Sequence, residues 1–398
     1  MKIAIFSDQF YPELSGIPDS IGALGKELGR RGHRVRFYVP RYSKHDYHKS
    51  SAHEKDTSFG VNVEVVRFPS FAITSPSGQG RGVIPAPWDW GKVRSFHPDV
   101  IHTQMNGGMG INALCAARQF KIPLVGTNHT AIRAYREFYP IKTEWFADFL
   151  LKFSNWYYGK CDFVSAPSQS VADEMREFGF VKECHTVSNP IDTETFCSLP
   201  NKKWLREQFG LSDKAVIFAS HLSAEKNIDV LIRAMTIVTK EIPDAQLAVA
   251  GHGPSEKELR DLAASQGITH AVKFLGFINK PSLAEAYNAS KAFVIASTAE
   301  TQSMVMMQAM AAELPIIAAE SRALPEYVNH KNGFLVEPGN AAAFAEKIIY
   351  LLRHPAERKK LGEGGRELAE TCSVPAIAET WEKIYENLVK SYNKGTSS

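Results

Sequence analysis

The chain has 398 residues, more than a single core usually needs, so we expect two domains of about 100 to 200 residues each. The formal net charge is only +3, and bulk electrostatics therefore give no reason to expect a nucleic-acid partner. The five cysteines are scattered without CxxC spacing, which favours free thiols in a reducing compartment over disulfides or a zinc site.

The first residues, "MKIAIFSD", turn polar too early for a signal peptide, and no apolar run in the sequence approaches the ~18 residues of a membrane span. We therefore expect a cytoplasmic protein. Residues 26 to 49 nevertheless carry eight lysines and arginines against two acidic residues, a local excess of +6. This basic stretch suits either the anionic inner face of a membrane, as a peripheral attachment, or a solvated helix face, and the sequence leaves both open.

Short β-branched runs alternate with amphipathic stretches along the first half of the chain. The predicted strands are 2–6, 34–39, 61–68, 99–102, 123–127 and 162–167, and the predicted helices include 17–31 and 110–120. This alternation is typical of βαβ units in a parallel sheet.

The same alternation restarts after the polar, proline-containing stretch 188–203. Predicted strands at 215–220, 245–251, 271–276, 291–297 and 314–319 alternate with predicted helices at 228–239, 255–266 and 303–312. We therefore predict an α/β protein with two doubly wound, Rossmann-like domains, 1–195 and 196–374. A C-terminal helix, 375–398, is expected to cross back to the first domain.

In open α/β sheets, ligands collect where strands end and helices begin. Three such junctions carry unusual residues. Gly16 precedes the first helix and permits close approach of the backbone to a ligand, although a plain connecting loop is the alternative. Lys226 lies at a helix entrance after His221, which suits an anion, although "EKN" is also common on surfaces. In "STAETQSMVMMQAMA", Glu300 and a polar turn precede an apolar helix.

Several motifs occur together in a specific order: "NPIDTETF", "HLSAEKN", "AGHGP", "VKFLGF", the "STAETQS" turn with "MAAELP", and "ALPEYVNHKNGFLVEPGN". Over nearly its whole length the chain resembles glycosyltransferase family 4, retaining enzymes of the GT-B fold. The resemblance implies two Rossmann-like domains that face a central cleft. It also implies a nucleoside diphosphate sugar as donor, without a metal ion or other cofactor.

The resemblance assigns roles to individual residues. The implied catalytic residues are His129, which meets the 6-hydroxyl of the donor sugar, Lys226 on the diphosphate, and Glu300, which contacts the sugar's hydroxyls as the first acid of the family's E-x7-E pattern. The N–H groups of the turn after Glu300 are expected to bind sugar and diphosphate, and the base is expected to meet mainly backbone. The implied donor-binding set is Gly16, His221, Lys226, Phe277, Ile278, Glu300, Thr301, Gln302, Ser303, Met304, Val305 and Gln308.

Three positions depart from the family's pattern. His221 stands where an arginine usually contacts the diphosphate, and its charge near pH 7 is weaker because the reference pKa of histidine is about 6.5. Gln308 stands where the second acid accepts hydrogen bonds from the ribose. An amide can accept one such bond and donate another, so we expect ribose binding to survive. Glu313 stands where glycine is common, and we expect it to face solvent at a helix C-terminus without a role.

The acceptor is expected near residues 136–160, where aromatic residues are interspersed with Lys142, Lys152 and Lys160. This composition suits an interfacial helix, with an ordinary core helix as the alternative. Because the donor turn and "TNHT" resemble the diacylglycerol glucosyltransferase branch, we predict transfer of a hexose from UDP-glucose to a membrane lipid such as diacylglycerol. The alternatives are a soluble acceptor, GDP-mannose as donor, a sugar-nucleotide epimerase, and a binding protein without turnover. The sequence predicts no oligomeric state.

Overall fold

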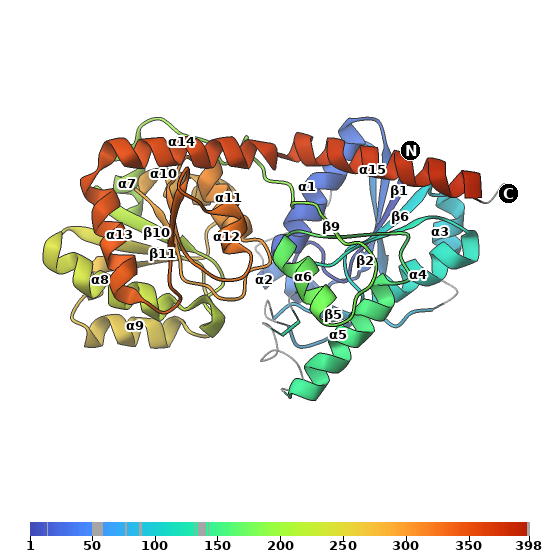
Figure 1. Ribbon diagram of the computed structural model, residues 1–398, viewed down its shortest axis with the longest axis horizontal. Helices are drawn as coiled ribbons and strands as arrows, with labels where there is room; N and C mark the ends of the chain where they lie inside the picture. The colour runs from blue at the N-terminus through green and yellow to red at the C-terminus, as the bar shows by residue number, and fades with distance from the viewer. Residues whose placement is uncertain are drawn as a thin grey trace. The chain divides into compact units, whose positions relative to one another are not determined.

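The computed structural model describes residues 1–13, 15–49, 59–75, 78–86, 90–130, 132–133, 141 and 143–395 (Figure 1). The chain forms two compact units. Unit 1 comprises Met1–Pro190 together with Val374–Ser398, and unit 2 comprises Ile191–Ser373. Each unit is built on its own parallel sheet, which confirms the predicted α/β class with two doubly wound sheets.

The seven-stranded sheet of unit 1 has the order β3-β2-β1-β6-β7-β8-β9. Its strands are β1 (Lys2–Phe6), β2 (Arg34–Pro40), β3 (Val63–Phe68), β6 (Val100–Thr103), β7 (Leu124–Thr127), β8 (Phe163–Ala166) and β9 (His185–Thr186), beside a small antiparallel pair, β4 (Phe71–Ala72) and β5 (Arg81–Gly82). The helices are α1 (Gly16–Arg30), α2 (Lys44–Lys49), α3 (Trp90–Phe96), α4 (Gly108–Phe120), α5 (Glu144–Tyr158), α6 (Gln169–Glu177) and α15 (Val374–Gly395).

Side chains alternate between the two faces of this sheet along each strand. Both faces are buried, because helices cover each of them. Along β1, Ala4 and Phe6 enter one apolar cluster with residues of α4 and α5, whereas Ile3 and Ile5 enter another with α1 and α15. Helix α15 belongs to this second layer, where Trp381 and Tyr385 are buried. The last helix of the chain therefore completes the core of unit 1.

The six-stranded sheet of unit 2 has the order β12-β11-β10-β13-β14-β15. Its strands are β10 (Lys214–Ala219), β11 (Ala245–Ala250), β12 (Val272–Gly276), β13 (Phe293–Ile295), β14 (Ile316–Ala319) and β15 (Gly333–Val336). The helices are α7 (Lys202–Phe209), η3 (Ala224–Lys226), α8 (Ile228–Glu241), α9 (Glu256–Ser265), η4 (Thr269–Ala271), α10 (Lys280–Ala289), α11 (Met304–Ala311), α12 (Leu324–Tyr327), α13 (Ala341–Arg353) and α14 (Pro355–Thr371).

The strand order of unit 2 reverses between β10 and β13, which are neighbours in the sheet although β11 and β12 lie between them in the chain. Ligands of open α/β sheets bind at the carboxyl ends of the strands beside such a reversal. A functional site is therefore expected at the loops after β10 and β13.

Candidate active site

Four neighbouring strands of unit 2 end in residues suited to a nucleotide. Phe277 follows β12, His252 follows β11, His221 follows β10 and Glu300 follows β13, in the spatial order of the strands. Parallel strands bring their carboxyl ends to one edge of the sheet, so these residues gather there. The site combines an aromatic ring, two imidazoles and a carboxylate.

An ion pair lies at the point where the strand order reverses. Lys226 Nζ donates to Glu300 Oε1 at 2.8 Å, and the two residues are only 7% and 9% exposed. Asn227 ties the same two loops together, since its amide donates to the carbonyl of Ala296 and to Thr298 Oγ1, both at 3.2 Å. The cation and the carboxylate are therefore held by the backbone around them as well as by each other.

Helix α11 begins directly after Glu300 and the polar turn 301–303. The first intrahelical bond runs from Met307 N to Ser303 O, so the N–H groups of Met304 and Val305 point out of the helix end without a helical acceptor. Ser303 is 2% exposed, and its hydroxyl has no hydrogen-bond partner among the described residues. Free N–H groups and a buried, unsatisfied hydroxyl at one helix end are suited to an anionic or hydroxyl-bearing ligand.

In unit 1, His129 follows β7 and is held by a buried amide. Its Nε2 lies 2.8 Å from Oε1 of Gln104, an acceptor, so Nε2 carries the proton and Nδ1 is left as an acceptor. Burial lowers the pKa of His129 to about 4, so the ring is neutral near pH 7. Gln104 Nε2 is buried without a partner among the described residues, and both side chains line a cavity of about 10 Å³.

A second buried histidine lies in the sheet behind this position. His102 contacts the hydroxyls of Tyr385 and Thr127, each at 2.7 Å, and its ring packs on Trp381. Burial, with a smaller contribution from the neighbouring His129, lowers the pKa of His102 to about 3. Because both ring nitrogens are engaged within the core, His102 is a packing residue that joins α15 to the sheet.

Two family models match the chain. Residues 14–195 match the model described as Glycosyltransferase Family 4, and residues 202–368 match the model described as Glycosyl transferases group 1. The chain belongs to glycosyltransferase family 4. It is a retaining hexosyltransferase that uses a nucleotide sugar.

Two of the relatives are named alpha-monoglucosyldiacylglycerol synthase. An alpha-monoglucosyldiacylglycerol synthase of Streptococcus pneumoniae (strain ATCC BAA-255 / R6) is 29% identical over 341 residues, covering 83% of this chain and 74% of the relative. One of Acholeplasma laidlawii is 26% identical over 407 residues and covers 99% of both chains. A GDP-mannose-dependent alpha-mannosyltransferase of Mycolicibacterium smegmatis is 24% identical, covering 98% of this chain and 97% of the relative.

Solved structures confirm the predicted GT-B fold. Anabaena Alr3699/HepE in complex with UDP has a TM-score of 0.78 at 20% identity and covers 97% of this chain and 100% of that chain. Sucrose-phosphate synthase from Thermosynechococcus elongatus has a TM-score of 0.75 at 20% identity, covering 98% and 99%. At this identity the likeness speaks for the fold alone.

Most of the residues to which the resemblance assigned family 4 roles lie in unit 2, at the edge of the sheet where its strands end. Lys226 and Glu300 are in direct contact, and Thr301, Gln302 and Ser303 form the turn before α11 rather than its first turn. Gln308 is buried within α11, and Ile278 is half-buried beside the exposed ring of Phe277. Gly16 and His129 are in unit 1, at the start of α1 and after β7. Their roles toward the donor stay predictions.

The sequence reasoning passed over Asp8, directly after β1. Its carboxylate accepts hydrogen bonds from Gly107 N at 3.1 Å and Met109 N at 2.8 Å, at the N-terminus of α4. Burial raises the pKa of Asp8, and these backbone bonds partly offset the rise. A Cβ on Gly107 would lie 2.8 Å from this carboxylate. The glycine pair at 107–108 was therefore the sequence signal for a close approach of another group to this turn.

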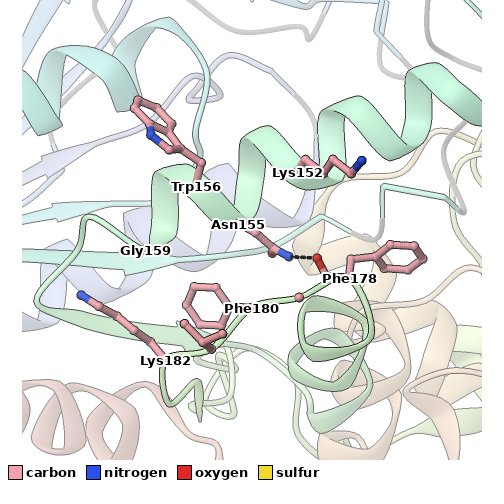
Figure 2. Close-up of a pocket in the computed structure, with 9 residues that line it drawn as sticks. Lys152, Asn155, Trp156, Gly159, Phe178, Phe180 and Lys182 are labelled. Carbon is pink, nitrogen blue, oxygen red and sulfur yellow. Dashed lines mark hydrogen bonds between the residues drawn. The ribbon is translucent and has the colours of Figure 1, made fainter.

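The predicted aromatic segment forms helix α5, although residues 136–140 and 142 lie outside the described residues. Its inner face is buried, whereas Trp145, Phe149 and Trp156 are 63%, 56% and 49% exposed. Near its C-terminal end, α5 and the loop 178–182 line a pocket of about 340 Å³ (Figure 2). Asn155 of α5 donates to the carbonyl of Phe178 at 2.8 Å and so links the helix to this loop (Figure 2). Exposed aromatic side chains on this scale mark an interaction surface.

The basic stretch 26–49 carries less excess charge in the fold than along the chain. Arg31 pairs with Glu27 and with Glu382, and Arg36 pairs with Glu64. Glu64 and Glu382 come from outside the stretch, so they offset part of the +6. Within the described residues, no helix combines the length and the apolar character that crossing a bilayer requires.

Proposed function

We propose that this protein transfers glucose, with retention, from UDP-glucose to the hydroxyl of diacylglycerol at a membrane surface. The observation that carries the donor half is the buried Lys226–Glu300 pair, 2.8 Å long, beside the N-terminus of α11. The cation suits the diphosphate, including the negative charge that develops on it as the sugar departs. The carboxylate suits the sugar hydroxyls, and the free N–H groups at the helix end suit anionic oxygens.

In this proposal Lys226 binds the diphosphate and stabilises the charge that grows on it as the sugar departs. Glu300 Oε1 already accepts from Lys226, so its second oxygen is the one that accepts from the sugar's hydroxyls. The N–H groups of Met304 and Val305, with Ser303 Oγ, bind the remaining diphosphate and sugar oxygens. Gln308 contacts the ribose, and Phe277 with Ile278 borders the base.

Retention is proposed to follow from front-face attack. The acceptor hydroxyl approaches the face of the sugar from which the diphosphate leaves, and an oxygen of the departing phosphate takes its proton. No pair of carboxylates flanking the bond is then required, in contrast to retaining glycosidases. His129 supports this step as a neutral acceptor for a sugar hydroxyl, since its pKa of about 4 leaves Nδ1 unprotonated.

The acceptor half rests on two observations. The two relatives named alpha-monoglucosyldiacylglycerol synthase extend over 83% and 99% of this chain. Helix α5 also exposes three large aromatic side chains, which suit the interfacial layer of a membrane. The pocket beside α5, lined by Trp156, Phe178 and Phe180 between Lys152 and Lys182, adds apolar surface with cationic edges.

A second candidate is mannosyl transfer from GDP-mannose. The observation in its favour is the M. smegmatis relative, named a GDP-mannose-dependent alpha-mannosyltransferase, which aligns with 98% of this chain. The two candidates share the diphosphate and differ in base and sugar. They are therefore separated by donor selection alone.

The experiment measures thermal stabilisation of the purified protein by UDP-glucose, UDP-galactose, UDP-GlcNAc and GDP-mannose, followed by transfer to dioleoylglycerol in vesicles. The proposal expects the largest shift with UDP-glucose and a glucolipid product. Stabilisation by GDP-mannose alone would select the second candidate. A shift with UDP-glucose but transfer only to soluble alcohols would remove the lipid acceptor and leave the donor standing.

A further inference from the structure

Two imidazoles lie side by side where β10 and β11 end. His221 follows β10 and His252 follows β11, and their ring centroids are 6.2 Å apart at an interplanar angle of 74°. His221 is half-buried and His252 is exposed. The resemblance to family 4 assigned a role to His221 but none to His252.

The backbone fixes this arrangement. Leu222 N donates to the carbonyl of His252 at 3.0 Å, and Ser255 N donates to the carbonyl of Leu222 at 3.0 Å. Gly251 has φ +131°, and a Cβ there would lie 1.9 Å from Ser220 O. A Cβ at Gly253 would lie 2.4 Å from the carbonyl oxygen of Leu222. Glycine is therefore required on both sides of His252, and the two loops are locked in register.

A third ring extends the row. Phe277 lies 6.1 Å from His252, edge to face at 81°, and is 49% exposed. An exposed aromatic face of this kind stacks on a nucleobase. Lys226, in η3, pairs with Glu300 after β13, which neighbours β10 on the side opposite β11. The row therefore runs from the base end of the proposed donor site to its diphosphate end.

We infer that His221 and His252 together bind the donor's diphosphate and that donor binding is coupled to proton uptake by this pair. The inference rests on the proposed donor site and adds His252 and a regulation by pH to it. The ring of His252 lies between those of Phe277 and His221.

The physical basis is the mutual effect of the three charges. Two imidazolium ions about 6 Å apart disfavour each other. A diphosphate within reach of both rings favours the charged form of each. Binding therefore draws protons from solvent, and the affinity falls as the pH rises above the reference value of about 6.5.

Three charged groups close to the pair along the chain already have other partners. Lys226 pairs with Glu300, and Glu225 accepts from Ser223 Oγ at 2.5 Å. At the start of α9, Glu256 pairs with Arg260. Of the ionisable side-chain types on these elements, imidazole is the one that ordinarily changes charge near neutral pH.

The test measures the dissociation constant of UDP-glucose by calorimetry from pH 6 to pH 8, in buffers of different ionisation enthalpy. UDP-glucose is suitable because its diphosphate is esterified at both ends, to the nucleoside and to the sugar, and does not titrate in this range. GDP-mannose replaces it if donor selection favours that nucleotide. We expect the affinity of the wild type to fall about tenfold or more over this range, with net proton uptake.

Three variants make the test specific. His221→Arg places a permanent cation at the first position and should flatten most of the pH dependence. His252→Ala should weaken binding at pH 6 severalfold and reduce proton uptake. His270→Ala, an exposed histidine of η4, should change neither. Melting temperatures are compared to confirm that each variant is folded.

Each outcome decides something. Donor binding with a flat pH profile, or a slope that survives in both His221→Arg and His252→Ala, would overturn the inference and leave the proposed donor site intact. Absence of donor binding at every pH would overturn the proposed donor site and the inference with it.

Discussion

Lys226 and Glu300 form a buried ion pair between the loops after β10 and β13, with Nζ and Oε1 2.8 Å apart. Removing one member of a buried pair leaves the other charge uncompensated, at a cost of about 3 to 5 kcal/mol. Keeping both members of the pair therefore matters for the stability of unit 2 as well as for the proposed donor binding. A loss of activity in a single variant does not by itself separate these two roles.

The double variant Lys226→Met with Glu300→Gln separates them. We expect either single change to lower both the melting temperature and turnover, and turnover at least a hundredfold, about 3 kcal/mol. The double variant should recover much of the melting temperature, because no buried charge is left alone, while turnover stays low. Recovery of turnover along with stability would show a purely structural pair. The exposed pair of Arg353 and Glu241 supplies the control, Glu241→Gln, which should alter neither.

Gln308→Glu should leave donor binding unchanged or tighten it. A carboxylate accepts from both ribose hydroxyls, whereas the amide accepts from one. Gln308 is only 6% exposed, so in the absence of the nucleotide sugar the new carboxylate is buried. Its burial should lower the melting temperature of the ligand-free protein. Calorimetry with UDP-glucose and melting curves with and without it measure both effects. Loss of binding would place the ribose elsewhere.

His129 and His102 should make unit 1 less stable in acid. Their folded pKa values, about 4 and about 3, lie below the unfolded value of about 6.5, so the unfolded chain binds more protons between these limits. Their contribution is complete above pH 6.5 and is lost as the pH falls from there toward 4 and 3. Each histidine contributes a slope of about 1.4 kcal/mol per pH unit in this window.

Urea unfolding between pH 5 and pH 6.5 measures this slope. His129→Asn should lower it by the contribution of one histidine, while His97→Asn, at an exposed position of the same unit, should leave it unchanged. An unaltered slope in His129→Asn would mean that this imidazole is already charged in the folded state.

Glu313→Gly should stabilise unit 2. Glu313 follows α11 with φ +63°, a left-handed conformation that costs a residue with a Cβ about 1 kcal/mol. The residue is exposed, as expected, and glycine removes the penalty. A rise in melting temperature is expected for Glu313→Gly. Glu313→Ala keeps the strain and removes the charge, so an equal rise in that variant would assign the effect to electrostatics.

The exposed aromatic side chains of α5 should hold the protein on membranes. We expect sedimentation with anionic vesicles, little with zwitterionic ones, and release by high salt. Changing Trp145, Phe149 and Trp156 together to serine should abolish most of the capture and leave stabilisation by UDP-glucose unchanged. Trp204→Ser, at a 54% exposed position of unit 2, is the control. Capture that survives the triple change would place the contact elsewhere.

The sequence predicted the fold well where local signals were strong. Strands such as β10 and β11 are continuous apolar runs bounded by turn residues, and they formed as expected. Strand β15 was missed because it has four residues and begins with Gly333, a poor strand former. A Cβ there would lie 2.2 Å from Ile316 O, so packing against β14 requires the glycine.

The site was predictable only in part. The sequence named Glu300 and Lys226 separately, and they are 74 residues apart in the chain. Their contact depends on β10 and β13 being neighbours in the sheet. His252 was passed over because a histidine between two glycines has no meaning until the loops of β10 and β11 are seen together. Long-range pairing of strands, rather than local pattern, assembles this edge of the sheet.

The most direct measurement of the proposed activity is the structure of the product. The purified protein is incubated with UDP-glucose and vesicles containing dioleoylglycerol, and the lipid fraction is analysed by proton NMR for its anomeric signal. The proposal predicts a monoglucosyl lipid in the α configuration, formed by the wild type and nearly absent with Glu300→Gln. A β-linked product, or release of free glucose without any glucolipid, would contradict it.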